Sequence, residues 1–313
     1  MSVPSLLVIG SLNMDIVVQV PDHPQPGETV LGSDYSLYPG GKGANQAVAA
    51  ARAGSCLVQM VGCLGSDAFG SQLREAIRQS GVGDDGIQSV DGSSGIALIT
   101  VSRQGQNSIV VSPGANARLD PDRLDRLLSP QVLASTQLLL LQLESPLPTV
   151  IRAIQTAQTA GIPVMLNPAP FMPLKWEVLR QVRYLVLNQT ETAGLLQQPI
   201  ADVLTAQNAA AALYRHGIPV PIITLGELGV VWASAEGIDH LPALGVEVVD
   251  TTAAGDCFCG ALASALVSGA SLRESICYGA AGAALAVTRV GAQPSLPWQP
   301  EIKAFLGTHS GGG

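Results

Sequence analysis

The sequence predicts an α/β protein with three layers, α/β/α, built on a mainly parallel central sheet, together with a small second β-sheet. Short apolar runs such as Leu6 to Leu12 and Leu138 to Leu143 are typical of strands buried on both faces. Helical segments, among them 149–160 and 205–216, alternate with such runs, and a glycine follows each of these two. Further β-prone pieces near the N-terminus have no helix between them, so they predict a separate sheet.

The composition favours a large folded core and argues against several classes of protein. Of 313 residues, 47% are hydrophobic and 13% are charged, so disorder is not expected. A net charge of -8 argues against nucleic acid as the main partner. No Lys or Arg precedes Lys42 and no apolar run approaches about 18 residues, so we expect neither a signal peptide nor a membrane span. Five cysteines without a C-x-x-C pattern agree with a reducing cytoplasm, and the four histidines show no metal-ligand spacing.

The second sheet is expected to form from two insertions, at about 16–38 and 94–112, within a single domain spanning 1–313. The β-prone pieces that form it are 17–20, 29–31, 94–102 and 107–112. A short polar turn separates the last two pieces, which predicts a β-hairpin. A small sheet beside the main domain could act as a lid that keeps water out of a reaction site.

The stretch from Asp250 to Gly260 carries the clearest chemical signal. A β-rich run, Gly245 to Val249, leads into a small-residue turn and then into an apolar helix. A helix that begins at such a turn presents free backbone N–H groups, which bind anions. Asp256 falls in the first helical turn, where a carboxylate is also common simply because the helix dipole favours it. Beside an anion cradle, however, this carboxylate suits a general base that deprotonates a hydroxyl attacking a phosphoryl group.

Other polar residues fall where apolar strands end, which in an open α/β sheet is where ligands bind. They are Asn13 and Asp15 after the first strand, Glu144 after a later one, and Asn188 and Glu191 after another. Each also has a simpler interpretation, as an Asx turn, an exposed carboxylate or a helix-start residue.

Two glycine-rich segments resemble nucleotide motifs without matching them. Gly40-Gly-Lys-Gly43 precedes an alanine-rich helix, but Gly follows the lysine where a Walker A loop needs Ser or Thr, so Lys42 could be an ordinary loop lysine. Gly81 to Gly86 matches G-x-G-x-x-G, yet it follows a helix and opens none, so we reject it as a dinucleotide fingerprint.

Two motifs together resemble a known family. Asp250-Thr-x-Ala-Ala-Gly-Asp-x-Phe-x-Gly260 is similar to the C-terminal signature of the ribokinase-like (PfkB-type) sugar kinases. Gly40-Gly-Lys-Gly-Ala-Asn-Gln-Ala-Val-Ala-Ala-Ala-Arg-Ala-Gly54 is similar to their N-terminal signature. The similarity extends from about Leu7 to Leu306. It implies the same fold, a lid, and a homodimer formed through the lids.

The resemblance also implies an activity and a set of site residues. The reaction would be ATP-dependent phosphorylation of the primary hydroxyl of a sugar, most closely O5 of D-ribose. Asp256 would be the general base, and the backbone amides of Ala253, Ala254, Gly255 and Asp256 would form an anion hole. The sugar contacts would come from Asn13, Met14, Asp15, Gly41, Lys42, Gly43, Ala44, Asn45, Glu144 and Asp256.

Three further ligands follow from the resemblance. ATP would contact Asn188, Thr224, Leu225, Gly226, Glu227, Leu228, Gly229, Gly255, Asp256 and Ala280. Mg²⁺ would lie near Glu191, which would reach it through water. K⁺ would be held, mostly by backbone carbonyls, at Asp250, Thr252, Ala286, Arg289, Gly291 and Ser295.

The sequence departs from the family at a few positions and leaves alternatives open. Ala280 stands where relatives often carry a polar residue or His, so contacts to adenine would rest on apolar packing. Cys257 and Cys259 replace commoner Thr and Asn, but the carboxylate and the glycines of the motif are intact. The chain could instead phosphorylate deoxyribose, fructose or adenosine. It could also bind a sugar without reacting, although the retained Asp256 and its cradle argue against that. A dinucleotide-dependent oxidoreductase has only the α/β pattern and the rejected glycine match in its favour.

Overall fold

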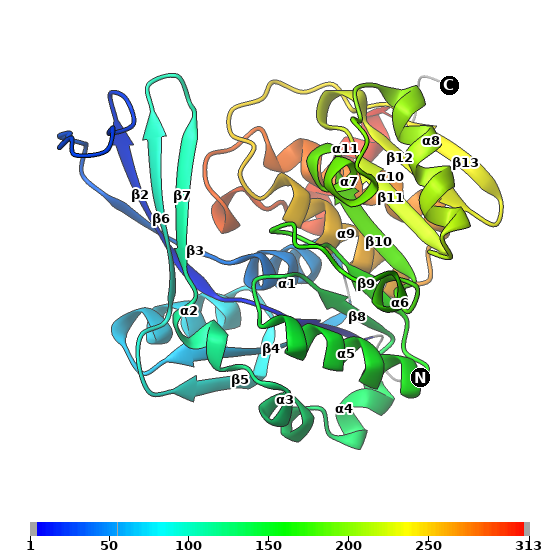
Figure 1. Ribbon diagram of the computed structural model, residues 1–313, viewed down its shortest axis with the longest axis horizontal. Helices are drawn as coiled ribbons and strands as arrows, with labels where there is room; N and C mark the ends of the chain where they lie inside the picture. Colours follow the sequence, from blue (N-terminus) through cyan, green and yellow to red (C-terminus); the bar gives the residue numbers. More distant parts are fainter. Residues whose placement is uncertain (1–4, 55, 310–313) are drawn as a thin grey trace.

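The computed structural model describes residues 5–54 and 56–309. Its larger sheet has nine strands in the order β13-β12-β11-β10-β9-β8-β1-β4-β5, and only β12 and β13 run antiparallel to their neighbours (Figure 1). In chain order the nine strands are β1 Ser5–Ile9, β4 Leu57–Gly65, β5 Gly83–Val90, β8 Leu138–Leu141, β9 Val164–Leu166, β10 Tyr184–Asn188, β11 Val220–Thr224, β12 Val230–Ser234 and β13 Gly237–Leu241. The predicted mainly parallel central sheet is therefore confirmed.

Helices cover both faces of this sheet and form two hydrophobic cores. One face packs against α1 Lys42–Ala53, α2 Ala68–Gln79, α9 Ala254–Val267 and α10 Leu272–Ala286. The helices that pack against the opposite face are α3 Pro121–Leu127, α4 Pro130–Ser135, α5 Leu147–Thr159, α6 Trp176–Leu179, α7 Gln189–Leu196 and α8 Val203–Arg215. The last helix, α11 Gln299–His309, lies against α1 and α10 through Ile302. Three layers, α/β/α, result.

The continuous apolar strands follow from this burial on both faces. In β1, Leu6 and Val8 point into one core while Leu7 and Ile9 point into the other. Because successive side chains of a strand alternate between faces, a strand covered on both sides needs an apolar residue at every position.

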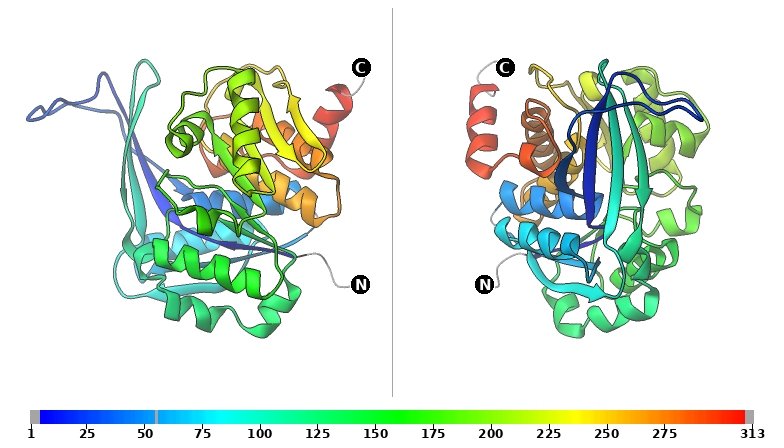
Figure 2. Two further views of the ribbon diagram at one scale, coloured as in Figure 1. Left: turned by 45° about the vertical axis from the view of Figure 1, so that its right-hand side comes forward. Right: turned by 90° about the vertical axis from the view of Figure 1, so that its left-hand side faces the viewer.

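The smaller sheet has four strands in the order β3-β2-β6-β7 and projects from one end of the main sheet (Figures 1 and 2). Its strands are β2 Asn13–Val20, β3 Ser36–Gly40, β6 Gly95–Ser102 and β7 Asn107–Ser112. The predicted hairpin is confirmed, because β6 and β7 pair antiparallel. The first strand, β1, ends at Ile9, earlier than predicted, and residues 10–12 connect it directly to β2. The polar residues Asn13 and Asp15, which were expected at the end of the first strand, therefore lie at the start of the small sheet.

Two predicted strand segments are wrong. Residues 29–31 form no strand, because β2 pairs instead with β3, which returns alongside Asn13 to Val17. The run from Gly245 to Val249 is also not a strand, and Val248 and Val249 are exposed. That segment leaves the edge strand β13 and crosses to α9, so no neighbouring strand is available to pair with it.

Three further features bear on the sequence analysis. Gly81 to Gly86 follows α2 and runs into the first half of strand β5, and it opens no helix, in agreement with its rejection as a dinucleotide fingerprint. The five cysteines are free thiols, and all except Cys277 are buried. Within residues 5–54 and 56–309, no helix is long and apolar enough to cross a membrane.

Small residues let α1 and α9 approach each other closely. A Cβ added at Gly260 of α9 would lie 2.5 Å from the Gln46 carbonyl oxygen and 2.6 Å from the Ala49 Cβ. Both distances are too short for real atoms, so the spacing of the two helices depends on glycine at this position. Since each helix begins at the carboxyl edge of the sheet, this spacing also positions the residues at their N-termini.

We predict that Gly260→Ala lowers the free energy of unfolding by about 1–3 kcal/mol, because overpacking a close helix contact is destabilising. The matched control is Gly307→Ala in the exposed part of α11, where an added Cβ meets nothing within 4 Å. That change should raise stability by up to about 1 kcal/mol through helix propensity. Urea unfolding of both variants checks the pair, and equal effects at the two positions would contradict the packing argument.

Candidate active site

Polar side chains meet at the carboxyl edge of the main sheet, where α1 and α9 begin. A cleft of about 220 Å³ lies there. Its lining brings together residues that the sequence analysis assigned to different ligands: Lys42, Asn188, Glu191, Thr224, Ala253, Ala254, Gly255 and Asp256. Asn167, Ala169, Val186, Leu187, Thr251 and Cys259 complete the wall. The strands β9, β10 and β11 end at this cleft, as expected for a ligand site in an open α/β sheet.

The N-terminus of α9 has no side-chain cap. Its N-cap residue Ala253 has a left-handed backbone, with φ of 59°. The Ala254 N–H donates to the Thr251 carbonyl at 3.3 Å, so it is partly used within the turn. The N–H groups of Gly255 and Asp256 follow at the cleft, where a helix N-terminus attracts negative charge. Of the four amides predicted to form the anion cradle, that of Ala254 is therefore partly engaged within the turn.

The Asp256 carboxylate is buried and held from two sides by side chains of α1. Asn45 Nδ2 donates to Asp256 Oδ2 at 3.1 Å, and Gln46 Nε2 donates to Asp256 Oδ1 at 2.9 Å. Each carboxylate oxygen thus has one donor from the protein and keeps further lone pairs for a ligand. The close packing of α1 and α9 makes both contacts possible.

Glu144 follows strand β8 and is fixed by several donors on a single oxygen. Ser11 Oγ donates to Glu144 Oε2 at 2.6 Å, the Lys42 backbone N–H donates to it at 3.0 Å, and Asn13 Nδ2 reaches it at 3.4 Å. This network ties together the end of β1, the start of α1 and the end of β8.

Asn13 and Asp15 lie at the start of β2, where the chain enters the small sheet. Asn116 Nδ2 donates to Asn13 Oδ1 at 2.7 Å, while Asn116 Oδ1 accepts from the Leu12 N–H at 2.9 Å. These contacts orient the Asn13 amide. Burial, together with the negative charges of Glu144 and Asp256, raises the pKa of Asp15 to about 7, although Lys42 opposes the shift.

The predicted Gly-Lys-Gly segment brings the start of α1 against the end of β1. Gly41 has a φ of 89°, and a Cβ on Gly43 would lie 2.5 Å from the Ser11 nitrogen. Met14, Ala44 and Asn45 are buried beside them. The charge of Asp256 raises the pKa of Lys42, while burial opposes the rise. Lys42 is therefore a cation within an acidic cluster, and its side chain lines the cleft.

Asn188 and Glu191 form a capping box at the start of α7. Asn188 Oδ1 accepts from the Glu191 N–H, and Glu191 Oε2 accepts from the Asn188 N–H, both at 2.8 Å. Burial raises the pKa of Glu191 despite the hydrogen bond from Asn188. The described residues contain no cluster of three or more His, Cys, Asp or Glu that could hold a metal. A Mg²⁺ ion that keeps most of its water and binds phosphate needs only one nearby carboxylate, and Glu191 fits that requirement.

Only some of the remaining residues predicted to contact ATP line the cleft. Thr224 ends β11 and lines the cleft. Residues 225–229 continue from it as a tight turn, in which the Leu225 N–H donates to the Gly229 carbonyl at 2.8 Å. Ala280 lies on α10, packs against the core and is not part of the cleft lining.

The segments predicted to bind K⁺ lie side by side. Val249 and Asp250 donate their N–H groups to the Val287 carbonyl, and the Gly291 N–H donates to Asp250 Oδ2 at 2.8 Å. Burial raises the pKa of Asp250, but donors from Thr252 and Gly291 outweigh it, so the pKa lies below its ordinary value. Ala286 ends α10, and Ser295 Oγ donates to Ala292. A carboxylate and backbone carbonyls match the oxygen ligands that a hard cation prefers.

The sequence analysis missed several polar residues that support the site. They are Ser11, Gln46, Asn116, Gln142 and Asn167, and all make the side-chain hydrogen bonds of this region. Two of them had a usable signal: Gln46 directly follows Asn45 in the glycine-rich motif, and Asn167 follows an apolar strand.

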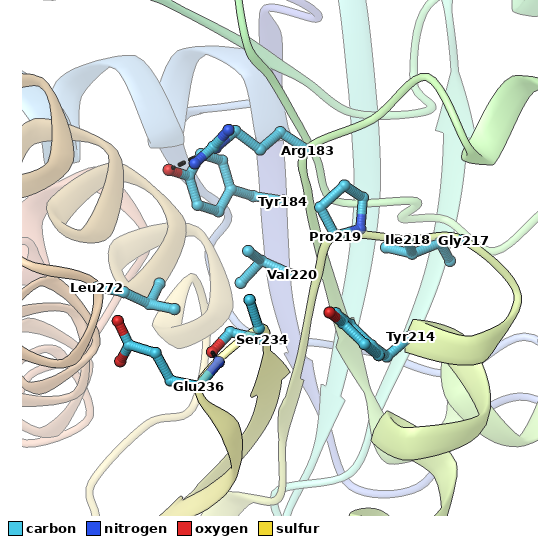
Figure 3. A pocket seen from close by; sticks show the side chains of 11 residues that line it. Arg183, Tyr184, Tyr214, Gly217, Ile218, Pro219, Val220, Ser234, Glu236 and Leu272 are labelled. Carbon is cyan, nitrogen blue, oxygen red and sulfur yellow. Dashed lines mark hydrogen bonds between the residues drawn. The ribbon is translucent and has the colours of Figure 1, made fainter.

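A larger groove, of about 580 Å³, lies at the opposite, amino ends of β10 and β11 (Figure 3). It is lined by Arg183, Tyr184 and Tyr214 with backbone and apolar groups, and Arg183 Nε donates to Tyr184 Oη at 3.2 Å. It has no carboxylate cluster, since Glu236 is the one acidic residue among its lining. The smaller cleft, which is lined by Lys42, Glu191 and Asp256, is therefore the better candidate for the active site.

Known proteins resemble this chain in sequence over nearly its whole length. Residues 3–299 match the family described as pfkB family carbohydrate kinase. The chain is 41% identical over 304 residues to a ribokinase of Haemophilus influenzae, covering 96% of this chain and 98% of that protein. It is 35% identical to a deoxyribokinase of Salmonella typhimurium, over 96% of this chain and 98% of that protein.

The solved structures lead to the same family. One is the Arabidopsis thaliana ribokinase complexed with ribose and ATP, with a TM-score of 0.88 and 32% identity, covering 98% of this chain and 99% of that one. The chain has an acidic cleft beside α9, and it is similar in sequence and in structure to these kinases over nearly its whole length. We conclude that the chain belongs to the pfkB family of carbohydrate kinases.

Proposed function

We propose that the protein transfers the γ-phosphoryl group of ATP to O5 of D-ribose, giving ribose 5-phosphate. The observation that carries this proposal is the position of Asp256, which lies close to the carboxylates of Asp15 and Glu144 and in the first turn of α9, whose N-terminus is uncapped. A hydroxyl bound beside these acceptors would thus lie near both a base and an anion site. ATP-dependent kinases named for ribose are among the relatives in sequence and structure.

The polar groups near Asp256 suit a ligand that donates hydrogen bonds. Asp15, Glu144 and Asp256 supply carboxylate oxygens, and the buried Asn45 Oδ1 has no hydrogen-bond partner in the described part of the protein. A polyol presents several hydroxyl donors in a small volume, so a sugar satisfies these acceptors better than an anion would. A buried acceptor that lacks a hydrogen-bond donor raises the free energy of the complex. A ligand with a hydroxyl at each acceptor should therefore bind more tightly than its deoxy analogue.

In the proposed reaction, Asp256 accepts the proton of the sugar O5 hydroxyl as that oxygen attacks the γ-phosphorus, and the bond from the γ-phosphorus to the bridging oxygen of the β-phosphate breaks to release ADP. The N–H groups of Gly255 and Asp256 stabilise charge on the transferring group. Lys42 lies in the same cleft and supplies a positive charge. Thr224, Asn188 and the turn at 225–229 would bind the nucleotide, with Ala280 nearby. Mg²⁺, held by the phosphates and by Glu191 through water, would neutralise the phosphate charge.

We further propose that the small sheet acts as a lid of a single-domain protein and pairs with the lid of a second copy. Apolar side chains are exposed on this sheet, among them Leu98, Ile109, Val110 and Val111. A second copy covering them would remove apolar area from water. A cytoplasmic location remains a prediction from the sequence.

Another sugar is the main alternative substrate, because a deoxyribokinase is also a relative. ADP release with ribose, 2-deoxyribose, fructose and adenosine as acceptors distinguishes these substrates. Binding of ribose without turnover on any acceptor would favour the silent sugar-binding protein.

We predict that Asp256→Asn lowers kcat by about 10²- to 10⁴-fold, the usual cost of removing a general base. The Kd for D-ribose, measured by calorimetry, should change far less, because an amide can still accept a hydrogen bond. Asp202→Asn is the matched control, since Asp202 caps exposed helix α8 and Asn caps equally well. Near-normal turnover of Asp256→Asn would refute the assignment of the base.

We predict that ribose binding weakens in acid, because the ionised Asp15 carboxylate accepts hydrogen bonds from sugar hydroxyls. With its pKa at about 7, Asp15 should lose most of its charge between pH 8 and 6, raising the ribose Kd about tenfold. A Kd that is constant over this range would contradict the role of Asp15.

The same residue should oppose folding at high pH. Between about pH 4 and 7 the unfolded chain has lost the Asp15 proton while the folded protein keeps it, so stability from this group falls as pH rises. Asp15→Asn should therefore unfold at a higher temperature than the parent protein at pH 8, in the absence of ligands, and should bind ribose poorly. A lower unfolding temperature would show that the carboxylate is stabilising.

We predict that turnover depends on K⁺, since the oxygen-rich segments around Asp250 would order the start of α9 when they bind it. Replacing KCl by NaCl at equal ionic strength should reduce kcat/KM several-fold. Asp250→Asn should blunt this difference while leaving the protein folded by circular dichroism. Equal rates in both salts for the parent protein would count against the cation site.

A further inference from the structure

Gln46 lies behind the proposed base and uses its whole amide in hydrogen bonds. It is fully buried on α1, one residue after Asn45. Its Nε2 group donates to Asp256 Oδ1 at 2.9 Å and to Asn167 Oδ1 at 3.2 Å. Its Oε1 atom accepts from Gln142 Nε2 at 2.6 Å. An amide has two donor hydrogens and one carbonyl, so all three groups are engaged.

The orientation of this amide is dictated by its neighbours. If the oxygen and nitrogen of Gln46 exchanged places, its oxygen would face two acceptors, Asp256 Oδ1 and Asn167 Oδ1. The Gln142 amino group would then face another amino group. The observed arrangement avoids both repulsions, so the chain Gln142 to Gln46 to Asp256 has one favourable direction.

We propose that Gln46 is the positioning residue for Asp256 in the phosphoryl transfer proposed above. Gln46 does not line the cleft, and protein groups already engage both of its donor hydrogens and its carbonyl, so Gln46 acts through Asp256 and not on the substrate. Asn45, by contrast, keeps an unpaired acceptor, its Oδ1 atom. Together the two donors bind one oxygen each and fix the plane of the carboxylate. The lone pairs that remain are then aimed at the attacking hydroxyl without rotation of the side chain during the reaction.

A neutral amide suits this task better than a charged donor. A lysine or arginine at this position would orient the carboxylate, but its positive charge would also favour the ionised form and weaken the base. Gln46 orients the Asp256 carboxylate through a hydrogen bond and carries no formal charge. Lys42, whose charge interacts with that of Asp256, lines the cleft, where phosphate binds in the proposed reaction.

The test is a double-mutant cycle with Gln46→Leu, which keeps the approximate size of the side chain and removes both donors. We expect kcat to fall about 10- to 100-fold, the effect of losing a hydrogen bond to a charged group, with KM for ribose and MgATP within about twofold. In an Asp256→Asn background the same change should alter kcat by less than about twofold, because the base through which Gln46 acts is gone.

A matched control separates positioning from general loss of stability. Thr149→Val removes a different buried hydrogen bond, from Thr149 to the Leu119 carbonyl, on helix α5 at the opposite face of the sheet. It should lower the unfolding temperature and leave kcat unchanged. If Gln46→Leu fails to fold, Gln142→Leu replaces it, with an expected loss in kcat of about 2- to 10-fold and unchanged KM values.

The outcomes distinguish this proposal from the proposed function. An unchanged kcat in Gln46→Leu, or an equal loss in both backgrounds, would overturn the positioning role while leaving Asp256 as the base. Near-normal turnover of Asp256→Asn alone would overturn the base assignment and this proposal with it. A rise in KM with constant kcat would assign Gln46 to substrate binding and would also overturn the positioning role.

Discussion

The close contact between α1 and α9 is the constraint on which the candidate site depends. Only because Gly260 and the alanines of α1 let the two helices touch can Asn45 and Gln46 reach Asp256, which is more than 200 residues away in the chain. The same contact sets the N-terminus of α9 beside that of α1, so a base, its two donors and the free helix amides share one corner of the fold. A larger residue at the contact would therefore disturb the proposed chemistry as well as the packing.

The site also concentrates negative charge at a cost to the free protein. Asp15, Glu144, Glu191 and Asp256 surround one lysine, Lys42, and burial with mutual repulsion raises the pKa of Asp15 and of Glu191. Such a cluster is unfavourable until hydroxyl groups, a cation or phosphate groups satisfy it. Polar residues that strain the unliganded state are typical of sites selected for function and not for stability. Binding of substrate should accordingly stabilise the protein.

Much of this architecture could be predicted from the sequence, for physical reasons. Strands buried on both faces need continuous apolar runs, and glycine or proline marks the ends of the helices, so the three layers follow from local patterns. The Gly245 to Val249 run misled the prediction because β-branched residues favour a strand only when a neighbouring strand is available. Gln142 and Asn116 could not be found from the chain alone. Their contacts join residues about 100 or more positions apart, and nothing local distinguishes a buried amide in a network from an ordinary polar residue.

The order of residues on α1 would couple binding of the sugar to orientation of the base. In the proposed reaction Gly41, Lys42 and Asn45 would contact the sugar. Asn45 and Gln46 each hold one oxygen of Asp256, so the start of α1 would serve both substrate and base. A sugar that engages the unpaired Asn45 Oδ1 would also steady the Asn45 amide, whose Nδ2 holds Asp256 Oδ2. Substrate binding and orientation of the base would then reinforce each other through a rigid helix, without movement of the backbone. Gln46 is tied to Gln142 and Asn167, which directly follow β8 and β9, so it holds Asp256 Oδ1 without the sugar, and the sugar would steady the donor to Asp256 Oδ2.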